Sequence, residues 1–290
     1  MPCPKGRNWR ASSSSTPLQT KLQVAPGVSP PTFTSIPKKG IPSETARLSL
    51  VRGWSLYEFR KVASTNFVAA NLPVWSAVRA DRQTDGRGRF QRTWISDEGG
   101  LWLSAVVPVQ PENTNAPALP LLAGLAVAES LRTLGVSGLR LRWPNDLMVK
   151  NRKLAGLLID QFAPGIAVVG VGINISNSPE KSGAITRNQV ARLSDLLNSC
   201  PTLEELTALI LGRLRDTLDE ASCPEAKGIL PRLNLLWGRP RRVELDLDGR
   251  MQRGVFIGVE PDGRLILRDK RGECQTWHAW QVRHLTELSG

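Results

Sequence analysis

The sequence predicts an α+β protein with a small β-barrel at its C-terminal end. Segments rich in β-branched and aromatic residues alternate with helical patterns between residues 48 and 237. After Gly238 the pattern changes to short alternating strands, separated by two Asp-Gly pairs and one Arg-Gly pair that are typical of turns. We therefore divide the chain into an extension of residues 1–47, a first domain of residues 48–237 and a barrel of residues 238–290.

Residues 1–47 have a composition that cannot form a core. They are rich in Ser, Thr and Pro, and their seven basic residues and one acid, Glu44, give them +6 of the formal net charge of +12. We expect this extension to be disordered. It resembles an organellar transit peptide, but it has no clear amphipathic helix bearing arginine. We therefore expect a bacterial extension of a cytoplasmic protein and keep a plastid or another organelle as the alternative. The remaining charge suits an enzyme of anionic substrates as well as a polynucleotide binder.

The cysteines do not indicate a disulfide framework or a metal site, and the apolar runs do not indicate a membrane protein. The four cysteines are scattered without a C-x-x-C pair, and only His278 and His284 could join them as metal ligands. We interpret the cysteines as reduced thiols and predict no metal site from these residues. The longest apolar run, Leu119 to Ala128, is about half as long as a transmembrane helix, so no membrane span is predicted.

The first domain combines strand and helix signals. The predicted elements are strands at residues 55–62, 74–81, 100–109 and 167–175, three strands within 139–160, a short helix in FVAANL, and helices at 119–134, 203–218 and 226–237. Ser64 or Thr65 is the predicted N-cap of the short helix, since a hydroxyl there can accept from the first free backbone N–H groups.

A basic loop lies between two of these strands, at residues 80–94. Gly86 and Gly88 let a ligand approach the backbone, and arginines 87, 89 and 92 surround them. No acid lies between Asp85 and Asp97, so we expect three guanidiniums free to bind carboxylate or phosphate oxygens. A solvated basic loop or an arginine-glycine tract that binds RNA is the alternative.

A second polar cluster follows in residues 139–160, which read strand, turn, strand, turn, strand. Arg142 precedes the Pro-Asn-Asp turn, Asn145 and Asp146 form it, and Lys153 opens the next apolar strand. Gly156 leaves room for a group to pack against the backbone. The alternative is a plain β-hairpin with an exposed lysine.

The combination of motifs is more specific than any one of them. In chain order they are S-T-N at 64–66, Q-x-x-G-R-G-R at 83–89 with Trp94, R-W-P-N-D at 142–146, R-K-L-A-G-L-L at 152–158 and G-V-G-I-N at 170–174. Over about residues 55–175 the chain resembles the catalytic domain of the biotin protein ligases. The resemblance implies a mixed β-sheet flanked by helices, related to class II aminoacyl-tRNA synthetases, followed by an SH3-like β-barrel. No helix-turn-helix is recognisable before this domain, so we expect the monofunctional type and no specific DNA binding.

The resemblance implies an ATP-dependent ligase. Biotin and ATP would form biotinyl-5′-AMP, and biotin would then pass to one lysine of a biotin carboxyl carrier protein of acetyl-CoA carboxylase. Mg²⁺ is expected as a cofactor because it neutralises the triphosphate. A lipoate or octanoate protein ligase of the same fold is the alternative, and a nucleic-acid-binding protein is a more distant one.

The resemblance also assigns roles to residues. The expected biotin contacts are Ser64, Thr65, Asn66, Gln83, Arg87, Gly88, Arg89, Lys153 and Gly156, of which Arg87, Arg89 and Lys153 are the expected catalytic cations. The expected ATP contacts are Arg92, Trp94, Arg142, Asn145, Asp146 and Asn174, with Asp146 also a candidate magnesium ligand.

Two positions depart from the family pattern. The family commonly has lysine at the position of Arg142, and glycine at the position of Gln91, which here follows Phe90 in place of a basic residue. Arginine is not a simple replacement for lysine at a phosphate, so we expect altered ATP affinity. Gln91 is expected to stiffen the loop.

Overall fold

The computed structural model describes residues 46–109, 118–183, 186, 189–223, 228–238 and 240–288. All of them belong to one compact unit, residues 36–290. The predicted disorder of the extension falls outside the described residues, except that the first strand already begins at Arg47. The separate domains of residues 48–237 and 238–290 stay a prediction.

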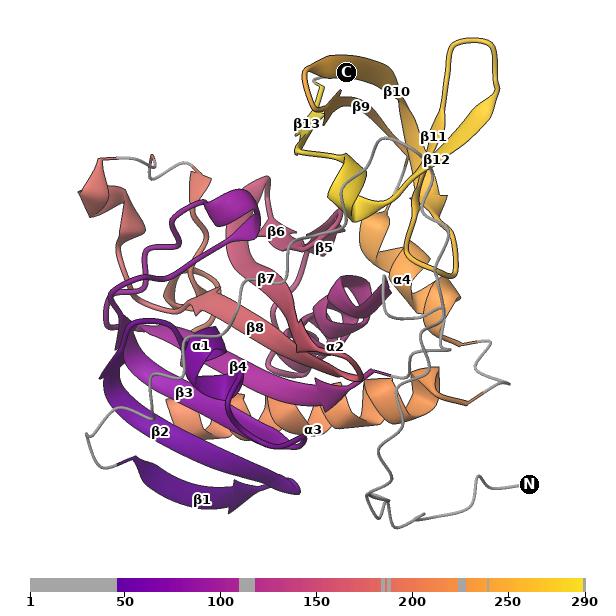
Figure 1. The fold of residues 1–290 in the computed structure, drawn as a ribbon. Coiled ribbons are helices and arrows are strands. Elements are labelled where there is room, and N and C mark those ends of the chain that lie inside the picture. The colour runs from indigo at the N-terminus through magenta and orange to yellow at the C-terminus, as the bar shows by residue number, and fades with distance from the viewer. Residues whose placement is uncertain are drawn as a thin grey trace, which may run out of the picture. The chain divides into compact units, whose positions relative to one another are not determined.

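An eight-stranded sheet forms the larger part of the described structure (Figure 1). Its strands lie in the order β1-β2-β3-β4-β8-β7-β6-β5, and only β2 and β3 run parallel. The strands are β1 (Arg47–Val51), β2 (Trp54–Val62), β3 (Ser76–Gln83), β4 (Gly100–Pro108), β5 (Leu139–Arg142), β6 (Asp146–Val149), β7 (Arg152–Ala163) and β8 (Ile166–Asn174). The mixed sheet predicted for this protein is therefore confirmed.

Alternation along the strands supplies two hydrophobic cores, one on each face of the sheet. In β4, Leu103 and Ala105 belong to the larger core with α2 (Leu119–Thr133) and α3 (Leu203–Ala221). Val106, one position on, belongs to a smaller core with Ala69 of α1 (Thr65–Ala69). The long helices thus cover one face, and the short helix lies on the other, where the candidate site is built.

Of the four α-helices that the structure describes, α3 has a side-chain cap at its start. Thr202 and Glu205 form a reciprocal capping box at the start of α3. The helix predicted from residue 226 is α4 (Ile229–Trp237), and its first predicted residues lie outside the described range. No helix in the described part of the chain is long and apolar enough to cross a membrane.

A five-stranded antiparallel sheet follows α4, as the alternating pattern predicts. It has the order β12-β11-β10-β9-β13, formed by β9 (Arg241–Leu247), β10 (Arg250–Val259), β11 (Leu265–Arg268), β12 (Cys274–Trp277) and β13 (His284–Glu287). The Trp143 indole donates to the carbonyl of Gly263 over 3.0 Å, and Arg140 pairs with Glu287. These contacts join the second sheet to the strand end where the polar cluster of residues 142–146 lies.

Candidate functional site

A pocket of about 270 Å³ lies over the middle of the large sheet, on the face that carries α1. Its lining includes every site residue expected from the sequence except Asn174: Ser64, Thr65, Asn66, Gln83, Arg87, Gly88, Arg89, Arg92, Trp94, Arg142, Asn145, Asp146, Lys153 and Gly156. Residues from strands far apart in the sequence meet here because β3, β4, β8, β7 and β6 are neighbours in the sheet.

One end of the pocket is lined mainly by hydroxyl and amide groups. The Gln83 Oε1 accepts from the Thr65 backbone N–H over 2.8 Å and lies 3.0 Å from the Thr65 hydroxyl. The Ser104 hydroxyl lies 2.7 Å from Thr65 Oγ1 and 2.6 Å from Asn66 Oδ1. Ser64, Thr65 and Asn66 are all buried. Ser64 occupies the N-cap position of α1, but makes no side-chain capping bond within the described residues.

The network ends on a carboxyl group that was not among the site residues expected from the sequence. Asn66 Nδ2 donates to Asp160 Oδ2 over 2.7 Å. Burial raises the pKa of Asp160, against the opposing effects of the Asn66 hydrogen bond and the Arg87 charge. Ser104 could have been found as a lone polar residue in the apolar run GLWLSAVVPV, whereas Asp160 depends on the pairing of strands.

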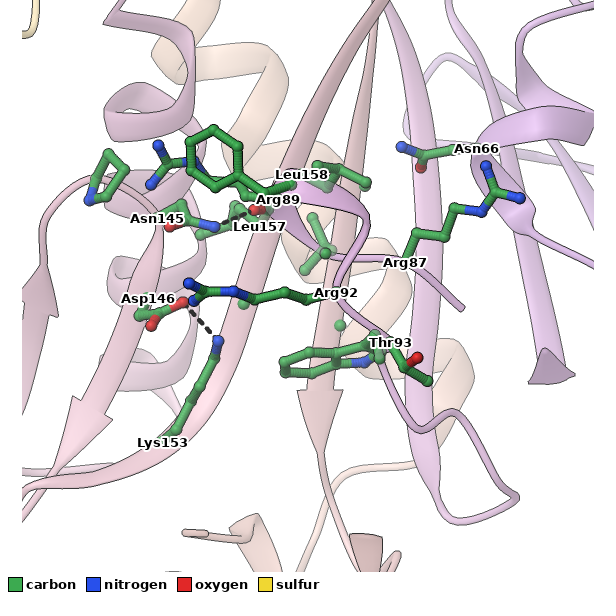
Figure 2. A pocket seen from close by; sticks show the side chains of 18 of the residues that line it. Asn66, Arg87, Arg89, Arg92, Thr93, Asn145, Asp146, Lys153, Leu157 and Leu158 are labelled. Atoms are coloured by element: carbon green, nitrogen blue, oxygen red, sulfur yellow. Dashed lines mark hydrogen bonds and ion pairs between the residues drawn. The ribbon is translucent and has the colours of Figure 1, made fainter. Parts of the chain in front are cut away.

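The opposite end of the pocket holds a charged cluster around Asp146. Lys153 Nζ lies 2.7 Å from one carboxylate oxygen, and Arg142 Nη2 donates to the other over 2.6 Å. Burial disfavours the charged carboxylate, but the charges and hydrogen bonds of the two cations outweigh it, so the pKa of Asp146 is lowered. Figure 2 shows Asp146 and Lys153 across the pocket from Asn66 and Arg87.

Asn145 supports the turn between these strands. Its Nδ2 donates to the Leu157 carbonyl over 2.6 Å, and the Leu157 N–H donates back to the Asn145 carbonyl over 2.9 Å. The turn that carries Asp146 is therefore tied to β7 by both bonds, which fixes the carboxylate relative to Lys153.

The arginine loop differs from the prediction in one respect. Arg87 is not an unneutralised cation, because its Nη2 lies 2.6 Å from Asp85 Oδ2, the residue at the edge of the acid-free stretch. Its guanidinium also lies over the Phe67 ring, 4.6 Å from the centroid. The prediction counted only the acids between Asp85 and Asp97, so it missed this pair.

Arg89 faces the segment that connects β12 and β13 of the second sheet. Its Nη2 donates to the carbonyls of Ala279 over 2.6 Å and Val282 over 3.0 Å. Burial lowers the pKa of Arg89 to about 10, despite the carboxylate of Asp146. Phe90 and Gln91, which follow it, have φ of 54° and 58°, a conformation that favours glycine. Glutamine at position 91 therefore carries backbone strain that a glycine would avoid.

Positive charge is concentrated on the side of the pocket that faces the second sheet. Figure 2 shows the Arg92 side chain extending toward Asp146, and its Nη2 is 3.5 Å from the Arg283 carbonyl. Burial and the nearby Arg92 and Arg142 guanidiniums lower the pKa of His284. The region is thus suited to an anion with more than one negative charge.

Trp94 covers the middle of the sheet beneath the pocket. A Cβ on Gly172 would lie 2.6 Å from Trp94 Nε1, and one on Gly156 would lie 3.0 Å from its ring. The room expected beside Gly156 is thus occupied by the indole. Lys153 Nζ lies 4.8 Å from the ring centroid, and Trp94 Nε1 is buried without a hydrogen-bond partner among the described residues.

Asn174 lies outside the pocket lining. Its Nδ2 donates to the Lys153 carbonyl over 3.3 Å, and its Oδ1 accepts from Asn177. This geometry does not support the expected contact with nucleotide or magnesium, and it makes Asn174 a support for the strand of Lys153.

The donor set does not fit a protein-held magnesium ion. Among the described residues no three His, Cys, Asp or Glu side chains gather as metal ligands. Both oxygens of Asp146 are taken by cations, so the expectation that Asp146 ligates magnesium is not supported.

Comparisons with known proteins agree with the motifs. The model of the Biotin/lipoate A/B protein ligase family matches residues 60–176. The biotin--[acetyl-CoA-carboxylase] ligase of Mycobacterium tuberculosis is 31% identical over 258 residues, which cover 80% of this chain and 90% of that protein. This chain belongs to the biotin protein ligase family. Within the family, the bifunctional ligase/repressor BirA of Bacillus subtilis is 27% identical over 218 residues, 70% of this chain, and the match spans 64% of that relative's length.

A solved biotin protein ligase shares the fold. The enzyme from Aquifex aeolicus, in complex with biotin and ATP, superimposes with a TM-score of 0.71 at 26% identity and covers 80% of this chain and 99% of its own. The α+β class with a mixed sheet, flanking helices and a C-terminal antiparallel sheet is therefore that of a biotin protein ligase.

Proposed function

We propose that this chain activates biotin with ATP to biotinyl-5′-AMP and transfers biotin to a lysine of a biotin carboxyl carrier protein of acetyl-CoA carboxylase. The observation that carries the proposal is one pocket with two chemically different ends, uncharged and polar at Thr65 and Gln83, cationic around Asp146. Biotin has the same division, since a ureido ring stands at one end and a carboxylate at the other. The names of the M. tuberculosis relative and the Aquifex complex support the same substrates.

The polar end favours biotin over lipoate or octanoate. Ser64, Thr65, Asn66 and Gln83 offer oxygen and nitrogen atoms that a ureido N–H or carbonyl can bind. A dithiolane ring or an alkyl chain has neither group, so it could form no hydrogen bond with these residues. Each such loss costs about 1–3 kcal/mol.

The cationic end supports the adenylation step. A biotin carboxylate oxygen attacks the α-phosphorus of ATP, a new P–O bond forms, and the P–O bond to pyrophosphate breaks. Negative charge gathers where Lys153 and Arg142 already converge on Asp146. Such preorganised donors stabilise a transition state by about 3–4 kcal/mol each in a site shielded from water.

The arginine loop and the second sheet supply the nucleotide side. Arg92, Trp94 and Arg142 are the proposed ATP contacts, with Asn145 and Asp146 beside them holding the turn. Arg87, Gly88 and Arg89 are proposed to cover biotin and the adenylate. Mg²⁺ is proposed to enter with ATP, held by phosphate oxygens and water, because the protein offers it no free carboxylate at Asp146.

The second step needs only an amine and the same cations. The neutral ε-amino group of the carrier lysine attacks the acyl carbon of the mixed anhydride, an amide bond forms, and the C–O bond to the phosphate breaks. AMP leaves with the oxygen that came from the biotin carboxylate. The nitrogen then loses a proton. Lys153 remains beside the phosphate oxygen on which the negative charge develops.

ATP–pyrophosphate exchange tests the proposal. We expect exchange with biotin and none with lipoate or octanoate. Lys153→Gln should lower exchange by about 100-fold or more, whereas Lys150→Gln, an exposed lysine in the neighbouring turn, should leave it intact. Exchange with lipoate or octanoate in place of biotin would keep the chemistry and overturn the substrate, and no exchange with any of the three would overturn the proposed activity.

A further inference from the structure

The polar end of the pocket contains a chain of close contacts whose protons can be counted. The chain runs from Gln83 through Thr65, Ser104 and Asn66 to Asp160, with successive distances of 3.0, 2.7, 2.6 and 2.7 Å. Each distance is that of a hydrogen bond, so each contact needs one proton between its two heavy atoms.

One end of the chain has a fixed direction. The Thr65 backbone N–H can only donate, so the group of Gln83 that faces it is the amide oxygen. The amide nitrogen then donates to Ser96 Oγ over 2.8 Å, and the Ser96 hydroxyl donates to the Trp94 carbonyl over 3.1 Å. Gln83 can therefore supply no proton to Thr65 and must accept one.

The other end depends on the charge of Asp160. If Asp160 is a carboxylate, Asn66 must turn its NH₂ toward it and its oxygen toward Ser104. Three oxygen–oxygen contacts, Gln83–Thr65, Thr65–Ser104 and Ser104–Asn66, then share only the two hydroxyl protons of Thr65 and Ser104. One pair of buried oxygens is left facing each other without a proton, which is costly in a dry site.

A neutral carboxyl group completes the count. With the Asn66 amide turned by 180°, so that its oxygen faces Asp160 and its NH₂ faces Ser104, Asp160 donates to the Asn66 oxygen and the Asn66 NH₂ donates to Ser104. Ser104 then donates to Thr65, and Thr65 donates to Gln83. Every contact holds one proton, and Thr65 Oγ1 keeps a lone pair that can accept a ligand N–H. The Asn66 amide occupies the space that the missing Cβ of Gly170 leaves, since a Cβ there would lie 2.5 Å from its Oδ1.

We propose that Asp160 is a positioning residue that acts as a neutral carboxylic acid and orients Asn66, and through it Thr65, to accept an N–H of the biotin ureido ring. This inference rests on the proposed function. Burial raises the pKa of Asp160, as the inference requires. The charge that opposes the shift is that of Arg87, and this guanidinium is itself paired with Asp85 at 2.6 Å.

Two variants distinguish the effect of a proton donor at position 160 from the effect of the size of its side chain. Asp160→Asn keeps a donor that can reach the Asn66 oxygen, while Asp160→Leu has a similar size and no donor. In calorimetric titrations of the full chain with biotin, we expect Asp160→Leu to bind about tenfold more weakly than the parent and Asp160→Asn to recover most of that loss. Difference infrared spectra of the biotin complexes, parent minus Asp160→Asn, should show the C=O band of a protonated carboxylic acid.

Either of two results would overturn the assignment. One is an Asp160→Asn variant as weak as Asp160→Leu, and the other is a difference spectrum with only a carboxylate band. If the parent itself fails to bind biotin, the proposed function fails first. A parent that binds biotin and exchanges pyrophosphate while Asp160 is ionised would leave that function intact and remove only the role of Asp160.

Discussion

Asp146 holds two cations at once, with Lys153 Nζ 2.7 Å from Oδ1 and Arg142 Nη2 2.6 Å from Oδ2. Folding lowers the pKa of this carboxylate, since the two cations outweigh its burial. A carboxylate whose pKa is lowered by folding stabilises the folded state at pH values above the ordinary Asp pKa. This stabilisation is lost as the pH falls through the pKa of the folded state. We therefore expect Asp146→Asn to be less stable than the parent at pH 7, by about 2 kcal/mol.

Urea unfolding from pH 7 down to pH 3 checks this expectation. The difference in the free energy of unfolding between parent and variant should become smaller at pH values below the ordinary Asp pKa of about 4. Asp219→Asn is the matched control, because its pair with Arg215 is exposed and should contribute at most about 0.5 kcal/mol. A gap that stays constant to pH 3 would show that the cluster adds no stability through the charge of Asp146.

Arg142 donates to Asp146 through a single guanidinium nitrogen, although arginine can bind a carboxylate through two. A lysine could supply a single contact of the same kind, so Arg142→Lys should retain pyrophosphate exchange with biotin to within about fivefold. Arg142→Met, which removes the charge, should lose at least about tenfold. Equal losses in the two variants would instead mean that the planar fork is needed when ATP is bound.

Arg89 connects the arginine loop to the second sheet through the carbonyls of Ala279 and Val282. Hydrogen bonds from a charged donor contribute about 1.5–3 kcal/mol each, so Arg89→Ala should release the loop. Limited proteolysis between Gly86 and Arg92 should become several-fold faster, and mass spectrometry of the cleaved peptides measures this rate. Arg87→Ala is the control, since its partner Asp85 lies in the same loop. If both variants are cut at the same rate, the second sheet does not hold the loop.

Much of the site could be predicted because its residues stand in short motifs that resemble those of the biotin protein ligases. The motifs at residues 64–66, 83–89, 142–146 and 152–158 all stand at or beside strand ends, and the sheet brings those ends to one pocket. Gly156 predicted a close approach to the backbone, and in the structure Trp94 fills the space beside both Gly156 and Gly172. What the sequence did not show is which group would make that approach.

The remaining contacts depend on register and backbone conformation. Asp160 reaches Asn66 because β7 and β8 pair Asp160 with Val168, two residues from Gly170, a relation that only the folded sheet defines. The Arg87–Asp85 pair depends on the course of the loop, and the partners of Arg89 lie 190 and 193 positions away. Local patterns carry no information on contacts of that range.

Gly172 provides the sharpest test of how Trp94 is placed. A Cβ there would stand 2.6 Å from Trp94 Nε1 and 2.8 Å from Cε2, so alanine must push the indole off the sheet. Because the Lys153 ammonium lies 4.8 Å from the same ring, the shift should disturb the cation as well as the proposed nucleotide contact. A displacement of about 1 Å can cost about 100-fold, so kcat/KM for ATP in pyrophosphate exchange should fall by that order.

The thermal midpoint of Gly172→Ala should change little in comparison, since the pocket, and not the buried core, takes up the movement. Gly212→Ala is the matched control, because its added methyl meets only Arg52 side-chain atoms at 3.7 Å or more, and alanine suits the α3 helix. It should leave exchange unchanged and stabilise the fold slightly. If the Gly172→Ala variant catalyses pyrophosphate exchange as well as the control does, Trp94 can move without loss of activity. Its packing against Gly156 and Gly172 is then not what orients Lys153 and ATP.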